Sequence, residues 1–227
     1  MESDLSDLRY LYRFGEYVGE NEKKTAAYLN TLPEETIAKM ADTYTEGFRQ
    51  GFVITGKDLS KKSVVHIEYS LGFERVIKRA IRNFEEMGLH TIIFRSPASV
   101  IVKSRYGKRG FVGGNVNKQY DYDHKDDIAL ILDKQFVERK LEVMRTAYEQ
   151  NKDMAVKLAG PAVMEVFGEM PFSPAVKPEA LRLTKNQEEL MLTLLSKASQ
   201  MTNYYIHGEE RSFTIIAWPV PEIGEKY

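Results

Sequence analysis

The feature that most constrains the fold is a strand, an amphipathic helix and a second strand that follow one another between residues 64 and 95. Residues 64–69 form a β-branched run bounded by charge, which is typical of a short buried strand. Apolar residues then recur at helical spacing up to Met87, and Gly88 stands where a left-handed cap would end the helix. Residues 90–95 are strand-like again. Strands joined in this way run parallel with a right-handed crossover, so we predict an α/β, Rossmann-like, mostly parallel sheet flanked by helices.

A second unit of the same kind lies toward the carboxyl end. Residues 162–167 predict a strand, residues 179–205 a helix, and residues 213–218 another strand. Thr184 and Gln187 have the spacing of a capping box, at which the helix could restart. The repeat of the pattern extends the predicted parallel sheet.

The remaining segments divide the chain into two predicted parts. Residues 1–60 predict a helical amino-terminal extension, with Pro33 at a helix start, and residues 61–227 the α/β part. A long helix is expected over residues 136–158, ending at Gly160 and the proline after it. The part between the two units is the hardest to interpret, and a strand at residues 100–102 is one interpretation.

Composition excludes several classes of function. The 32 basic and 33 acidic side chains nearly cancel, which gives no electrostatic reason to expect nucleic acid or an anionic membrane as a partner. The chain has no cysteine, so disulfides, thiolate metal sites and a cysteine nucleophile are excluded. We find no signal peptide and no apolar run near the roughly 20 residues that span a bilayer. We therefore expect a cytoplasmic protein.

Two polar segments could carry chemistry. The glycine-rich segment 107–114, Gly107 to Gly114, suggests a phosphate loop, but its lysine precedes the glycine pair and no helix clearly follows. A mobile or substrate-covering loop is the favoured interpretation. Acidic residues with one histidine follow, and they could hold a divalent ion or simply decorate a helix start: Asp121, Asp123, His124, Asp126 and Asp127. The second interpretation is favoured, because the spacing is not that of an EF-hand.

The histidines do not form a recognisable zinc motif. His66, His90, His124 and His207 include no pair four residues apart, and no HExxH occurs. His66 and His90 lie on neighbouring predicted strands and could approach each other, although structural roles are commoner for such residues. We assign no catalytic, cofactor-binding or metal-binding residue to this chain.

Three stretches in order resemble the amino-terminal domain of the thermophilic-type metallo-aminopeptidases, the leucyl aminopeptidase and aminopeptidase T family. Residues 64–94 resemble the family's opening strand, helix and strand. Residues 163–169, Val-Met-Glu-Val-Phe-Gly-Glu, resemble a strand that runs into Gly-Glu before a proline-bearing loop and a long helix. Residues 212–221, Ser-Phe-Thr-Ile-Ile-Ala-Trp-Pro-Val-Pro, are similar to an aromatic-Thr-aliphatic strand that leaves through Pro-x-Pro. The last stretch is the most specific.

The resemblance implies a cytosolic exopeptidase that removes amino-terminal residues from peptides, usually as a homodimer, with divalent Zn, Co or Mn. It also implies that the metal ligands lie in a carboxyl-terminal half beyond Tyr227, so the chain alone is expected to be inactive. The helices before residue 60 and the segment 107–127 have no counterpart in the resemblance.

Two other functions stay open from the sequence. One is a stand-alone Rossmann-like module that binds a small molecule at the loops after Tyr69, Phe94 and Phe167, where open parallel sheets place their ligands. The other is a dimerisation module, whose apolar interface we expect around Trp218 and the two prolines that follow it.

Overall fold

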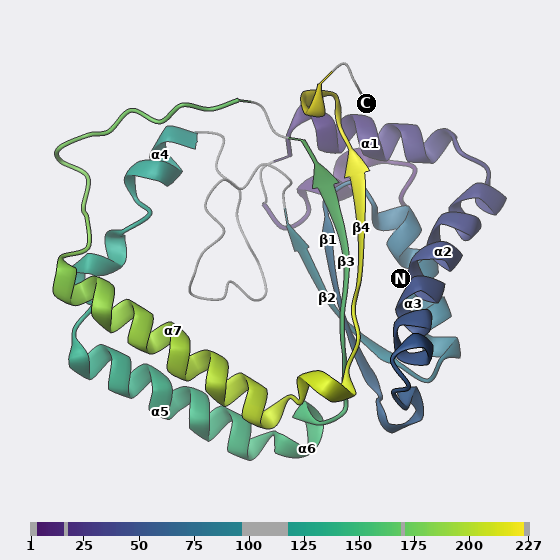
Figure 1. The fold of residues 1–227 in the computed structure, drawn as a ribbon. Helices are drawn as coiled ribbons and strands as arrows, with labels where there is room; N and C mark the ends of the chain where they lie inside the picture. The colour runs from purple at the N-terminus through teal and green to yellow at the C-terminus, as the bar shows by residue number, and fades with distance from the viewer. Residues whose placement is uncertain (1–3, 16–17, 97–117, 169–170, 225–227) are drawn as a thin grey trace.

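The computed structural model describes residues 4–15, 18–96, 118–168 and 171–224, and its centre is a parallel sheet (Figure 1). Four strands, β1 (Val64–Ser70), β2 (His90–Ser96), β3 (Leu158–Phe167) and β4 (Thr214–Pro219), pair in the order β2-β1-β3-β4. Every pairing is parallel. The predicted α/β, Rossmann-like fold is therefore confirmed.

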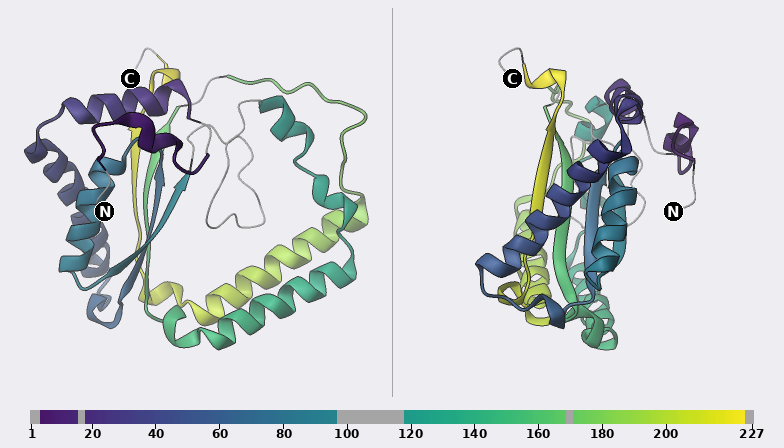
Figure 2. Two further views of the ribbon diagram at one scale, coloured as in Figure 1. Left: turned by 180° about the vertical axis from the view of Figure 1, so that it is seen from behind. Right: turned by 90° about the vertical axis from the view of Figure 1, so that its right-hand side faces the viewer.

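Helices connect the strands on opposite sides of the sheet (Figures 1 and 2). The helices are α1 (Glu20–Thr31), α2 (Glu34–Ile54), α3 (Glu74–Glu86), α4 (Lys118–Asp123), α5 (Lys134–Gln150), α6 (Lys152–Ala155) and α7 (Lys185–Tyr205). Helices α2 and α3 cover one face, whereas α5 and α7 run side by side in the same direction and extend from the lower end of the other side. The chain passes from β1 to β2 on one side of β1, and then to β3 and β4 on the other side. Right-handed crossovers in these two opposite directions place the connecting helices on opposite faces of the sheet.

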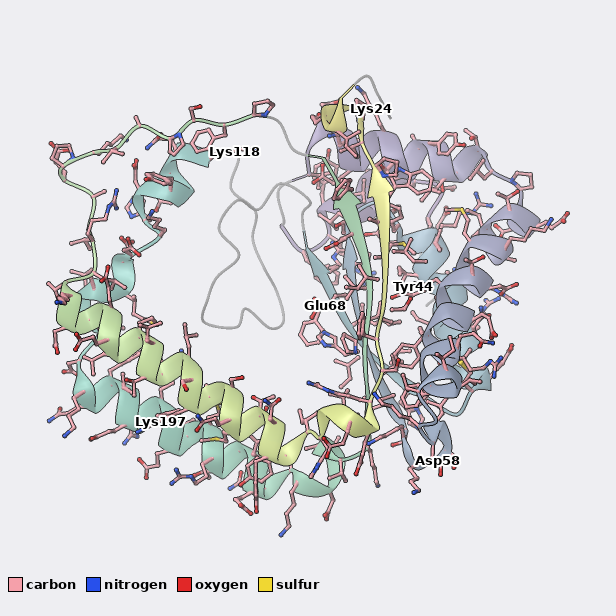
Figure 3. All side chains as sticks on the ribbon, in the orientation of Figure 1. Lys24, Tyr44, Asp58, Glu68, Lys118 and Lys197 are labelled. Carbon is pink, nitrogen blue, oxygen red and sulfur yellow. The ribbon has the colours of Figure 1, made fainter. Side chains whose placement is uncertain are left out.

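Alternation along β1 explains which face the helices cover. Val65, Ile67 and Tyr69 are buried and point toward α2 and α3, while His66 and Glu68 lie on the opposite face. Figure 3 shows Glu68 directed away from the two helices. Successive strand residues point to opposite faces, so one period-two pattern decides which side is the core.

Aromatic side chains join α2 and α3 to each other above the sheet. Phe84 meets Phe48 edge to face with ring centroids 5.4 Å apart, and meets Tyr44 in the same way at 6.1 Å. The buried side-chain amide of Asn83 donates to the Thr45 hydroxyl at 3.0 Å and to the Asp42 carboxylate at 2.8 Å, which joins the two helices through polar groups as well. Burying each large apolar side chain contributes roughly 1.5–3 kcal/mol.

The pair of α5 and α7 has an apolar core of its own. Leu132, Val137, Leu141, Met191 and Leu194 form a cluster separate from the one beneath α2 and α3. Each helix has a good start: the Asp133 carboxylate accepts a hydrogen bond from the Phe136 amide at 2.7 Å, and Thr184 and Gln187 form the predicted capping box.

Two predicted boundaries are wrong around β3. The helix expected over residues 136–158 ends at Gln150, and Leu158 already pairs with Val64 in β1. Gly160 and its proline do not follow a helix but stand inside the strand. The register shifts between Val64 and Val65, which makes Ala159 an extra, bulged residue. Gly160 has φ of 127°, and the Ser212 carbonyl oxygen would lie 1.8 Å from any Cβ there.

The other predicted elements agree with the structure apart from one further boundary. Helix α7 begins at Lys185, not at residue 179, because the capping box at Thr184 starts it. The strand suggested at residues 100–102 lies outside the described residues. The division of the chain at residue 60 stays a prediction. In the folded molecule, Tyr44 and Phe48 of α2 share one core with Ile67 of β1.

Candidate functional site

The carboxyl end of β1 leads into a buried carboxylate at the start of α3. The chain turns at Gly72, whose φ of 104° brings it close to the Glu22 carbonyl, and reaches Glu74 in the first turn of the helix. Two donors converge on Glu74 Oε2: the Gly72 amide at 2.9 Å and the Tyr10 hydroxyl at 3.1 Å. Glu74 Oε1 faces the Arg95 guanidinium of β2 at 3.6 Å.

Burial sets the electrostatics of this carboxylate. The Glu74 side chain is only 9% exposed, and this burial raises its pKa despite the hydrogen bonds and the nearby guanidinium, which favour the charged form. Burial also raises the pKa of the Tyr10 hydroxyl, and the neighbouring carboxylate adds to the effect. A cavity of about 170 Å³ lies beside the group, and the cationic side chains of Arg13 and Lys78 contribute to its wall.

Sequence reasoning missed this cluster. In the sequence, Glu74 has the pattern of an ordinary acidic residue in the first turn of an amphipathic helix, where the dipole favours it. Glu74 is buried because residues 4–15 fold back over the end of β1. The side chain of Leu11, which belongs to this segment, is fully buried there. The only signal in the sequence is an acid that directly follows the apolar segment Leu71-Gly72-Phe73.

Two of the three stretches that carry the family resemblance meet at the carboxyl edge of the sheet. The Val220 amide donates to the Phe167 carbonyl at 3.0 Å. Gly168 has φ of 118°, and a Cβ there would lie 2.8 Å from the Ile223 amide nitrogen and 3.0 Å from a Val220 methyl. The segment Pro-Val-Pro, through which the chain leaves β4, packs so closely on the residue after β3 that this residue has to be glycine.

The residues of the acidic cluster pair with different partners instead of converging on one point. Asp123 pairs with Lys177 at 2.7 Å and accepts from the Gln119 amide at 2.6 Å. The hydrogen bond from Lys177 holds the pKa of Asp123 below its usual range. His124 instead pairs with Asp127 at 2.8 Å. Within the described ranges, no three His, Asp or Glu side chains are grouped so that they could hold a metal ion.

The strand histidines are not brought into contact by the register. His66 stands opposite Ile92 and His90 opposite Val64, and the His66 ring packs edge to face on Phe94 at 4.1 Å. His207 is exposed and precedes a short 3₁₀ turn. The glycine-rich segment 107–114 lies outside the described residues.

Trp218, around which the sequence predicts an interface, is partly buried, and the interface itself stays a prediction. Its ring packs edge to face on Phe73, with the ring centroids 5.7 Å apart, and its centroid lies 6.4 Å from that of Tyr28. Its position on β4 points it toward the helices. Exposed apolar side chains of β4 and the residue before it, Ile215 and Phe213, belong to the opposite face.

Comparison of the chain with protein-family models, with curated proteins and with solved structures gives no match. In the part of the chain that the structure describes, no helix combines the length and the apolar character needed to cross a bilayer.

Proposed function

We propose that these residues are the amino-terminal part of a metal-dependent aminopeptidase, which releases amino-terminal residues from peptides. The metal ligands lie on polypeptide beyond Tyr227. In this proposal the enzyme is cytoplasmic and homodimeric, and uses Zn, Co or Mn. The support is the order of the three stretches of the family resemblance, which coincide with β1-α3-β2, the end of β3, and β4.

The observation that carries the proposal is the contact between Gly168 and the exit of β4. A strand followed by a glycine and a Pro-x-Pro exit are each common in proteins. Here they form one packed unit, in which the absence of a side chain at Gly168 admits Val220 and Ile223. Their contact in space supports treating the two patterns as one unit.

The chemistry of the proposal divides between the two parts of the enzyme. A bound divalent metal would polarise the scissile carbonyl and lower the pKa of the attacking water. The described residues of this chain would supply a rigid parallel sheet, whose carboxyl edge at Gly72 and Gly168 orients the polypeptide that follows. Rigid elements hold catalytic groups more accurately than loops do.

The coding sequence downstream of the Tyr227 codon gives the first test. We expect an open reading frame that supplies Glu, His and Asp ligands. The extended protein should hydrolyse amino-acid p-nitroanilides, and a chelator should abolish this activity until metal is restored. Residues 1–227 alone should show no turnover with Zn²⁺, Co²⁺ or Mn²⁺.

Either of two results would contradict the proposal. One is a downstream sequence without such ligands. The other is chelator-sensitive peptidase activity of residues 1–227 alone, because the ligands would then belong to this chain.

A further inference from the structure

An apolar cavity lies where the α5–α7 pair meets the lower end of the sheet, away from the carboxyl edge considered above. Its volume is about 570 Å³, within the range of about 300–1,000 Å³ typical of ligand pockets. Val64, Ile92 and Leu158 form the wall from the sheet, at the ends opposite to those where parallel sheets usually bind ligands. Met144 of α5 and Leu194 of α7 stand on the helical walls.

The polar groups in these walls are already engaged with the protein. The Tyr148 hydroxyl donates to the Thr202 hydroxyl at 3.1 Å, which joins α5 to α7 across the cavity wall. The side-chain amide of Asn151 donates to the Ala147 carbonyl at 2.8 Å. A water in such a cavity would find few partners, so the site favours an apolar occupant.

The cavity is long and has one charged end. Its wall on α5 runs from Lys140 to Asn151, about 16 Å at the rise of an α-helix. Lys140 is the only charged side chain among the described lining residues, and its ammonium lies 5.7 Å from the centre of the Phe136 ring. The sheet residues lie at the other end. An occupant with an apolar tail and an anionic head matches this polarity.

The volume of about 570 Å³ is that of a small-molecule pocket. A single aliphatic chain is narrow and fits between two helices and a sheet.

We propose that this cavity binds a single-chain anionic amphiphile, such as a fatty acid. The tail lies between α5, α7 and the sheet, and the carboxylate lies beside Lys140.

Displacement of a fluorescent probe, 11-dansylaminoundecanoic acid, by dodecanoate and by uncharged dodecanol tests the proposal below their micellar concentrations. Ala147→Trp fills the cavity from an exposed position on α5, and we expect it to weaken both ligands at least tenfold. Val143→Trp is the matched control, because Val143 is exposed on the same helix and does not line the cavity. It should leave both affinities unchanged. Lys140→Gln should weaken dodecanoate about tenfold and leave dodecanol unchanged.

Circular dichroism checks that each variant folds, and Ala198→Trp on α7 replaces Ala147→Trp if that variant does not. Failure of dodecanoate to displace the probe overturns the proposal. Equal affinities of the Ala147→Trp and Val143→Trp variants for dodecanoate and dodecanol would overturn it as well. A chain that is dimeric by light scattering, and becomes monomeric only when the cavity is filled, would show that a second copy occupies the site instead.

Discussion

Glu74 shows how one side chain can depend on a distant segment for its properties. Its carboxylate is solvated in an unfolded chain, and in the folded protein it is covered by residues 4–15 and held by Tyr10 and Gly72. Burial raises its pKa above the ordinary value near 4.5, so the folded protein binds this proton more tightly than the unfolded chain does. The contribution of this carboxyl to stability is therefore complete at pH values below the ordinary pKa, and is lost as pH rises through the folded value.

The Glu74→Gln variant tests whether the contribution of this carboxyl to stability falls as pH rises. Gln cannot ionise, so the free energy of unfolding of the variant relative to wild type should increase between pH 4 and pH 7, whatever the offset at pH 4. Urea unfolding at a series of pH values measures it. Arg95, Arg13 and Lys78 stay in place as the surrounding cations. The exposed Glu86→Gln on the same helix is the control. A relative stability that falls with pH would contradict the burial argument.

A comparison of Gly160 with Gly88 separates two contributions to the loss of stability on substitution, the strain of the backbone conformation and the lack of space for a side chain. Gly160→Ala should destabilise the protein by more than about 4 kcal/mol, because Ser212 leaves no space for a methyl group. Gly88→Ala also has a positive φ, of 79°, but meets no atom within 4 Å, so only the strain of about 1–2 kcal/mol applies. Chemical denaturation of both variants measures the difference. Equal costs would show that the β3 bulge relaxes around the new methyl group.

Helix α7 is an element whose start is decided locally. Thr184 accepts from the Gln187 amide at 3.3 Å, and the Gln187 side chain accepts from the Thr184 amide at 3.1 Å. The same Gln187 side chain donates to the carbonyls of Ala129 and Leu132, so the cap also fastens the turn before α5. This explains why the helix begins six residues later than its apolar pattern suggested.

Removal of the cap should be measurable on its own. Thr184→Ala should cost about 1 kcal/mol of stability, because it removes the hydroxyl that satisfies a free amide of the first turn. Thr193→Ala lies in the middle of the same helix, is exposed, and replaces a poor helix former with the best one, so it should cost nothing. Thermal denaturation of the pair compares them. A larger loss for Thr193→Ala would mean that the cap does not control the helix.

Two of the apolar cores formed by the described residues differ in size and in the helices they join. The larger joins α2 and α3 to the sheet, and the smaller lies between α5 and α7. Opening of the smaller core need not expose the larger, so the two parts should differ in local stability.

Hydrogen exchange should reveal this difference. Amides of α5 and α7 should exchange through local opening before those of β1 and β3. Leu141→Ala should accelerate exchange in α5 and α7 while leaving β1 protected, and Phe48→Ala should accelerate β1. Exchange followed by mass spectrometry measures both. Equal acceleration of all segments by Leu141→Ala would show that the two cores open as one unit.

Local patterns determined the strands, the main helices and the parallel direction of the sheet, because period and crossover length depend on neighbouring residues. The capping box at Thr184 belongs to the same class. Tertiary structure alone decided the features that bring distant residues together: the bulge at Gly160 beneath Ser212, the burial of Glu74 under residues 4–15, and the cavity between α5, α7 and the sheet. No local pattern encodes these, because each depends on atoms contributed by segments far apart in the chain.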